Sequence, residues 1–224
     1  MGTGKDSHIT HIAWIPQKLL SGTPSVFSPS VFINSKIEYA QFKLAIRHTK
    51  KVAAMEKIVI EPVIEQMSAD LSQLLEGREI KSPVMIGVQT GGVWVAEQLH
   101  RKLEIEEPLG SLGISFYRDD FSRIGLHPQV EPSSLPFSVE NRDIILCDDV
   151  LYTGRTIRAA LNAIFDFGRP NSIILAVLVD RGCRELPVQP DIAGKTLTPD
   201  DLPKTKQIKL SGPSPLQLKV CDVQ

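Results

Sequence analysis

The chain has 224 residues, of which 42% are hydrophobic and 23% charged, and its formal net charge is -1. These values are typical of a globular protein of one or two domains, and no apolar run approaches the roughly 18 uninterrupted residues of a membrane-spanning helix. Near-neutrality also excludes the general attraction by which strongly basic proteins coat nucleic acid, so that only a local basic patch could bind it.

Charge is distributed unevenly along the chain. Residues 1–54 carry seven lysines and arginines against two acids, a balance of +5, while the remainder carries 18 against 24, a balance of -6. The first 54 residues show no hydrophobic period, and we expect loop or disorder there. They are either a targeting segment or sequence upstream of a natural start at Met55, and we favour the second. Three cysteines without metal-ligand spacing favour a reducing, cytoplasmic setting.

From residue 55 the pattern becomes regular. Apolar residues at helical spacing predict a helix over residues 62–77, with Pro62 in its first turn. A buried strand over residues 83–88, a glycine turn over residues 89–92 and a helix to about residue 103 follow. This part of the sequence therefore predicts a strand, a tight turn and a helix in succession.

The same order repeats further along the chain. We expect strands at residues 112–116, 144–147 and 173–179, and a helix over residues 157–165 that stops at a Gly-Arg-Pro sequence. Residues 122–136 hold one glycine and three prolines and show no period, which is typical of a functional lid or an insert. Alternating strands and helices predict an α/β fold with a mainly parallel sheet flanked by helices, in which sites lie at the carboxyl ends of the strands.

Three segments follow from this reading. They are a basic leader at residues 1–54, a main domain at residues 55–200 and a short β appendage at residues 201–224. The appendage is expected because two short alternating segments, residues 207–210 and 216–220, flank a Ser-Gly-Pro-Ser-Pro turn.

The most informative stretch follows the strand at residues 144–147. Asp148 and Asp149 come first, and Arg155 and Arg158 then crowd the first turn of the next helix, whose dipole is already positive there. Buried carboxylates need polar partners, and cations at this end are favourable when an anion sits over the turn. The acids can accept hydrogen bonds from ribose hydroxyls, and the turn beside them can bind a phosphate. Together they predict a site for a ribose 5-phosphate. The alternative is an ordinary helix cap with incidental charges.

The stretch resembles the motif that binds phosphoribosyl pyrophosphate (PRPP) in type I phosphoribosyltransferases. Its members here are Asp148, Asp149, Val150, Leu151, Tyr152, Thr153, Gly154, Arg155 and Thr156. Together with residues 115–120 and 179–187, this stretch resembles the sequences of bifunctional pyrimidine operon regulators and uracil phosphoribosyltransferases. The resemblance covers about residues 58–199. The resemblance implies the type I fold with a small hood and an irregular N-terminal extension.

The resemblance also implies roles for single residues. Thr90 and Gly91 match the pyrophosphate loop, which without the resemblance would be an ordinary glycine turn. Arg118 and Asp119 match the start of a catalytic lid, and Asp148 and Asp149 are implied as catalytic residues with them. The base site is implied for three residues at a strand end: Val179, Asp180 and Arg181. The structural alternatives are a solvated charge cluster for the lid and a plain turn for the strand end.

The implied reaction joins uracil to PRPP and gives UMP and pyrophosphate, with Mg²⁺ carried by PRPP instead of being held directly by the protein. The implied partners are PRPP, uracil and UMP, and the implied assembly is a homodimer or higher homo-oligomer. An RNA-binding attenuator with residual catalysis is the alternative, as is transfer to another base. RNA binding is doubtful because Cys183 and Gln189 replace a histidine and an arginine of RNA-binding members, although Arg184 and Lys195 remain.

Overall fold

The computed structural model describes residues 36–114, 132–198 and 201–223. The chain divides into two compact units, Met1–Ala40 and Gln41–Gln224, and the fold described below belongs to the second. None of the described helices is long and apolar enough to cross a membrane. The expected lid residues Arg118 and Asp119 lie outside the described residues, as do residues 1–35 of the leader.

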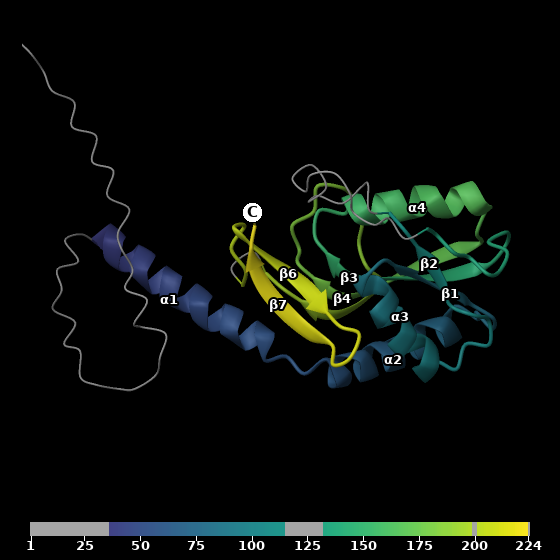
Figure 1. The fold of residues 1–224 in the computed structure, drawn as a ribbon, viewed down its shortest axis with the longest axis horizontal. Helices are drawn as coiled ribbons and strands as arrows, with labels where there is room; N and C mark the ends of the chain where they lie inside the picture. Colours follow the sequence, from purple (N-terminus) through teal and green to yellow (C-terminus); the bar gives the residue numbers. More distant parts are fainter. Residues whose placement is uncertain (1–35, 115–131, 199–200, 224) are drawn as a thin grey trace, which may run out of the picture. The chain divides into compact units, whose positions relative to one another are not determined.

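A parallel sheet of five strands forms the centre of the second unit (Figure 1). Its order is β2-β1-β3-β4-β5, and each neighbouring pair is parallel. The strands are β1 (Val84–Val88), β2 (Gly110–Leu112), β3 (Asp143–Leu151), β4 (Ser172–Asp180) and β5 (Ile192–Thr196). The expected mainly parallel sheet is confirmed. β2 lies earlier than the strand expected at residues 112–116 and shares only Leu112 with it.

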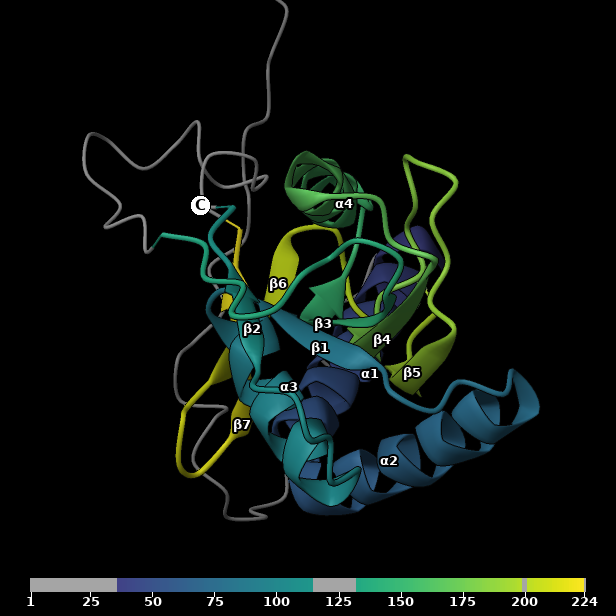
Figure 2. The same cartoon turned by 90° about the vertical axis from the view of Figure 1, so that its right-hand side faces the viewer.

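Helices cover both faces of this sheet, which explains its nearly continuous apolar strands. Helices α2 (Ile60–Gly77) and α3 (Gly91–Lys102) lie on one face and α4 (Arg155–Phe167) on the other (Figure 2). Side chains of β3 alternate between the two cores: Ile145 and Cys147 face α2 and α3, while Ile144 and Leu146 face α4. All four are fully buried. Burial on both faces fixes the register of β3 and therefore the place where its polar end emerges.

Helix α1 (Lys36–Glu56) corrects the expectation of loop or disorder for the part of the leader that it covers. Residues 36–56 contain no glycine or proline and are rich in lysine, alanine and glutamate, which favour helices. The apolar period is obscured because Phe42, Leu44 and Ile46 are exposed. The last turns of α1 nevertheless join the body, where Met55 is buried in the core beside α2.

Strands β6 (Lys206–Ser211) and β7 (Gln217–Asp222) form a separate antiparallel sheet, called the hairpin below. The expected β pair at the end of the chain is thus confirmed. The hairpin is no loose appendage, because Ile208, Leu210 and Leu218 are buried in the same core as α2 and α3. This packing brings the hairpin against the main sheet.

An ion pair ties α1 to the segment that precedes the hairpin. The ammonium of Lys51 lies 2.6 Å from the carboxylate of Asp201, which also accepts hydrogen bonds from the backbone N–H and the hydroxyl of Thr198. Lys51, and to a lesser degree Thr198, holds the pKa of Asp201 well below its ordinary value of 3.8. The pair is partly exposed, so its contribution to stability is modest.

We expect Lys51→Met to lower the free energy of unfolding at pH 7 by about 1 kcal/mol or less. A depressed pKa stabilises the fold above the unfolded value and loses this effect as the pH falls, so the difference from wild type should shrink below pH 3.8. Urea unfolding at pH 7 and pH 3 measures this. Lys50→Met, at an exposed neighbouring position, is the control, and an equal loss in both variants at pH 7 would contradict the prediction.

Candidate active site

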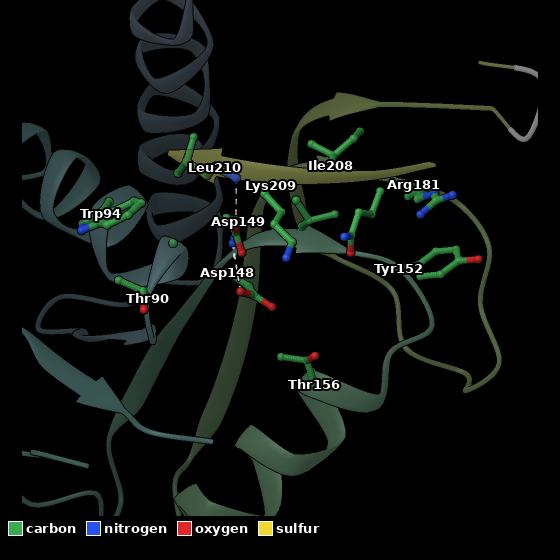
Figure 3. Close-up of a pocket in the computed structure, with 13 residues that line it drawn as sticks. Thr90, Trp94, Asp148, Asp149, Tyr152, Thr156, Arg181, Ile208, Lys209 and Leu210 are labelled. Atoms are coloured by element: carbon green, nitrogen blue, oxygen red, sulfur yellow. Dashed lines mark hydrogen bonds between the residues drawn. The ribbon is translucent and has the colours of Figure 1, made fainter. Parts of the chain in front are cut away.

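A pocket of about 310 Å³ opens at the carboxyl ends of β1, β3 and β4 and is bounded on another side by β6 (Figure 3). It therefore lies where a parallel α/β sheet places its sites. Residues far apart in the sequence line it: Thr90, Gly91, Trp94, Asp148, Asp149, Val150, Tyr152, Thr156, Arg181, Gln207, Ile208, Lys209 and Leu210.

Two adjacent carboxylates form the floor of this pocket. Asp148 and Asp149 are 4% and 8% exposed and belong to β3, which extends to Leu151 and so beyond the strand end expected at residue 147. Oδ1 of Asp148 accepts the backbone N–H of Asp149 at 2.9 Å, and Oδ2 of Asp149 accepts that of Leu210 at 3.4 Å. The side chain of Asp148 extends into the pocket (Figure 3). The acid pair is therefore buried by the protein yet open to a ligand.

The turn after β3 leads directly into helix α4. Gly154 begins the helix with a φ of 92°, a left-handed conformation that favours glycine. The Thr153 hydroxyl accepts the backbone N–H of Arg155 at 3.3 Å, but the N-cap residue is Gly154, and α4 has no side-chain capping hydrogen bond. Thr156 in the first turn lines the pocket, where the helix dipole and first-turn N–H groups favour an anion. The structure therefore does not show the ordinary side-chain cap that was the alternative for this turn.

The glycine turn after β1 packs directly on the acid pair. A Cβ at Gly92 would lie 2.6 Å from the carbonyl oxygen of Cys147, and one at Gly91 would collide with the carboxylate of Asp149. The Gln89–Thr90 peptide bond is cis. The absence of side chains at Gly91 and Gly92 lets the start of α3 approach β3 closely, and this places the expected pyrophosphate loop beside the expected ribose site.

Arg181 follows β4 and lies over the side of the pocket. Its guanidinium carbon is 4.0 Å from the centre of the Tyr152 ring, and its Nη2 donates to the Pro203 carbonyl at 3.1 Å. The residue is only 4% exposed, and burial lowers its pKa, although arginine remains charged in proteins. Its Nε is buried and has no hydrogen-bond partner among the described residues. A ligand in the pocket could accept a hydrogen bond from this donor.

Arg184 lies nearby and joins two loops. Its Nη2 donates to Oδ1 of Asp180 at 2.7 Å, its Nε to the Val188 carbonyl at 2.8 Å and its Nη1 to the Tyr152 carbonyl at 3.1 Å. Oδ1 of Asp180 also accepts the backbone N–H of Gly182 at 2.8 Å. Because Arg184 and Asp180 have side chains only 12% and 11% exposed, the pair is a largely buried ion pair, and it fixes the Tyr152 loop against the end of β4.

The structure brings together many, but not all, of the residues expected in the site. Eight line the pocket: Thr90, Gly91, Asp148, Asp149, Val150, Tyr152, Thr156 and Arg181. Six lie in the same segments but do not line it: Leu151, Thr153, Gly154, Arg155, Val179 and Asp180. The guanidinium of Arg155, which we interpreted as facing an anion, lies 2.6 Å from Glu185 on the surface.

Sequence reasoning missed the contribution of the hairpin and of Trp94. Four consecutive residues of β6 line the pocket, from Gln207 to Leu210. Their alternation predicted a strand, but nothing in the local pattern indicated that this strand would lie across β3. The link between them is the hydrogen bond from Leu210 to Asp149, which spans 61 residues of sequence.

Comparison with known proteins defines the class. A model of the phosphoribosyl transferase domain matches residues 55–204, and the chain belongs to this family. It is 55% identical to the bifunctional protein PyrR of Nitrosococcus oceani, over 72% of this chain and 90% of the relative. It is also 53% identical to the bifunctional protein PyrR of Pseudomonas fluorescens, over 72% of this chain and 94% of that one. The family expected from the motifs is thus confirmed.

The fold has counterparts among solved structures. A hypoxanthine-guanine phosphoribosyltransferase from Bacillus anthracis superimposes with a TM-score of 0.52 at 18% sequence identity, over 63% of this chain and 82% of that one. At this identity the likeness concerns the fold alone. The expected type I phosphoribosyltransferase fold is confirmed.

We expect Arg184→Met to lower the free energy of unfolding by about 3 kcal/mol, because it leaves the buried carboxylate of Asp180 without its cation. Urea denaturation followed by circular dichroism measures the change. Arg155→Met is the matched control: its ion pair with Glu185 is more than half exposed on both sides and should contribute about 1 kcal/mol at most. A loss as small for Arg184 as for Arg155 would contradict the structural role of Arg184.

Proposed function

We propose that this chain is a uracil phosphoribosyltransferase that forms UMP and pyrophosphate from uracil and PRPP. The observation that carries the proposal is the meeting, in one pocket, of the acid pair, the first turn of α4 and the glycine turn before α3. PRPP carries phosphate groups at both ends of a ribose. Two helix N-termini with a pair of carboxylates between them are complementary to this pattern.

The acid pair and the two turns each bind a different part of PRPP. Asp148 and Asp149 accept hydrogen bonds from the ribose hydroxyls, the turn over residues 153–156 holds the 5-phosphate, and Thr90 and Gly91 hold the pyrophosphate. Support comes from the buried but pocket-facing acids and from the packing of Gly91 on Asp149. This packing sets the distance between the ribose and the leaving group.

Arg181 and Tyr152 are the proposed walls of the base site. The stacked pair presents a flat surface, and the buried Nε of Arg181 offers a donor to a carbonyl oxygen of the base. Val179 and Asp180, also expected to bind the base, are buried and do not line the pocket. Asp180 acts through Arg184, which holds the Tyr152 loop in place.

The proposed chemistry needs no protein nucleophile. A bond forms between a ring nitrogen of uracil and C1 of the ribose as the bond from C1 to pyrophosphate breaks, and the proton of that nitrogen is released with the leaving group. Catalysis therefore comes from positioning and from stabilisation of charge. The three cysteines are free, and burial raises the pKa of the Cys147 thiol, which makes it a poor nucleophile. Arg118 and Asp119 are proposed to act from the lid.

Mg²⁺ is the proposed cofactor, and the donors present fit an ion that arrives with the substrate. Such an ion would neutralise phosphate charge. Among the described residues, no cluster of three or more histidine, cysteine, aspartate or glutamate side chains could form a protein cage. The pocket instead offers two neighbouring carboxylates, which suit an ion that keeps phosphate oxygens and water as its other ligands.

Regulation through RNA is the second candidate, because relatives at 53–55% identity are named bifunctional. One observation weighs against it: Arg184, which we considered as an RNA contact, is occupied by Asp180 and two backbone carbonyls. A gel shift with the cognate pyrimidine leader RNA, with and without UMP, separates the readings. Tight binding that UMP strengthens would favour the attenuator.

A cytoplasmic location and a homodimer or higher homo-oligomer complete the proposal. The location is supported by the three free cysteines, which fit a reducing compartment. Sedimentation velocity measures the assembly state.

A panel of bases tests the choice of substrate. With PRPP and Mg²⁺ we expect product from uracil and little or none from orotate, adenine, guanine or hypoxanthine. Release of pyrophosphate measures turnover for every base in the same way. Reaction with only a purine or orotate would overturn the assignment to uracil while leaving the class of enzyme intact.

We expect Asp149→Asn to lower kcat/KM for PRPP about 10- to 100-fold, because hydrogen bonds to a charged acceptor are worth about 1.5–3 kcal/mol. Asp166→Asn makes the same change on the exposed part of α4 and is the control. Steady-state kinetics provides the measurement, and far-UV circular dichroism checks that both variants fold. Unchanged kinetics in the Asp149 variant would remove Asp149 from the ribose site.

A further inference from the structure

The hairpin places one cation over the acid pair. Along β6, Ile208 and Leu210 are each 7% exposed and are buried in the core beside α2 and α3. Lys209 lies between them with its side chain on the opposite face of the strand, and it also lines the pocket. Its ammonium extends toward Asp148 (Figure 3).

The position of Lys209 is fixed by its neighbours on the strand. The backbone N–H of Leu210 donates to Oδ2 of Asp149 at 3.4 Å, which ties β6 to the end of β3. At the far end of β6, the backbone at Gly212 packs closely on Trp94, since a Cβ there would lie 2.9 Å from the indole ring. Trp94 belongs to α3, the helix whose first turn carries the expected pyrophosphate loop. The hairpin therefore packs against both β3 and α3, next to that loop.

The hairpin pairs opposite charges at one position of its register and like charges at another. Lys206 and Asp222 lie opposite each other in the register and form an ion pair of 2.7 Å. Lys209 lies opposite Lys219 in the same register, and like charges at directly opposite positions destabilise an antiparallel pair. The register therefore gives this part of the hairpin two adjacent positive charges.

The pocket needs a cation at this point. Among the described residues that line it, the cations are Arg181 and Lys209. Arg181 is held against Tyr152 and the Pro203 carbonyl, on the side proposed for the base. The glycine turn contributes no charged side chain, so its main-chain groups alone would face the doubly phosphorylated end of PRPP. Lys209 has a long side chain and directly precedes Leu210, whose backbone N–H is hydrogen-bonded to Asp149.

We propose that Lys209 binds the pyrophosphate group of PRPP and remains bound to it as it leaves. The inference rests on the proposed function and adds the hairpin to the PRPP site. Its ammonium supplies a point charge that the glycine turn lacks, and a flexible lysine can follow the phosphate oxygens as charge builds on the leaving group. The product UMP contains no pyrophosphate, so its binding should depend much less on Lys209 than the binding of PRPP does.

Calorimetric titration of the full chain tests this without turnover. The titrants are PRPP with Mg²⁺, pyrophosphate with Mg²⁺, and UMP, and the variants are Lys209→Met, Lys209→Arg and Lys219→Met. We expect Lys209→Met to weaken PRPP and pyrophosphate binding about tenfold or more and to change UMP binding less than about threefold. Lys209→Arg keeps the charge and should stay within about threefold of wild type for all three ligands.

Lys219→Met is the matched control because it removes the same charge from the directly opposite position of the hairpin, outside the pocket lining. It should alter binding of each ligand less than about twofold. Equal PRPP affinity in wild type and Lys209→Met would overturn the inference, as would a loss of UMP binding as large as that of pyrophosphate. A wild-type chain that binds neither PRPP nor pyrophosphate would instead overturn the proposed function.

Discussion

The burial of two adjacent carboxylates at the end of β3 is the constraint on which the rest of the site depends. Asp148 and Asp149 follow strand residues that are fully buried between two helical layers, so the strand cannot turn them toward bulk solvent without moving its core residues. Buried acids need donors, and Asp149 obtains one from the backbone of Leu210 and space from Gly91. The glycine turn, the hairpin and the pocket between them are arranged around this need.

Two arginines three residues apart show how context divides similar side chains between binding and structure. Arg184 has donors directed at Asp180 and at two loop carbonyls, and its hydrogen bonds hold the wall of the pocket. Arg181 stacks on Tyr152 and keeps a buried Nε without a partner among the described residues. The sequence shows two cations near a strand end. Only the directions of their donors distinguish the residue that faces a ligand from the one that positions it.

What could be predicted from sequence depended on whether the cause was local. The parallel sheet, the glycine turn and the acid-rich stretch follow from patterns a few residues long, and they were recognised. Helix α1 was missed because Phe42, Leu44 and Ile46 face away from any core and so obscure its period. The hairpin was recognised as a β pair, but its place over β3 depends on a contact across 61 residues, which no local pattern encodes. The part of the site that the hairpin contributes could therefore not be predicted from the sequence and required the structure.

The acidic balance of the main domain makes the position of each cation in the pocket important. The portion after residue 54 carries a balance of -6, which repels a polyanion such as PRPP at long range. The pocket must reverse that field locally, and it contains two acids itself. Helix dipoles act only within about a turn of their ends, so a cation that extends into the centre of the pocket is effective where the dipoles fade. Strand β6 can supply this cation without burying its charge. Ile208 and Leu210 bury their side chains in the core, while Lys209 between them keeps its ammonium in the open pocket. The hairpin is thus the element best suited to bring positive charge to an acidic body.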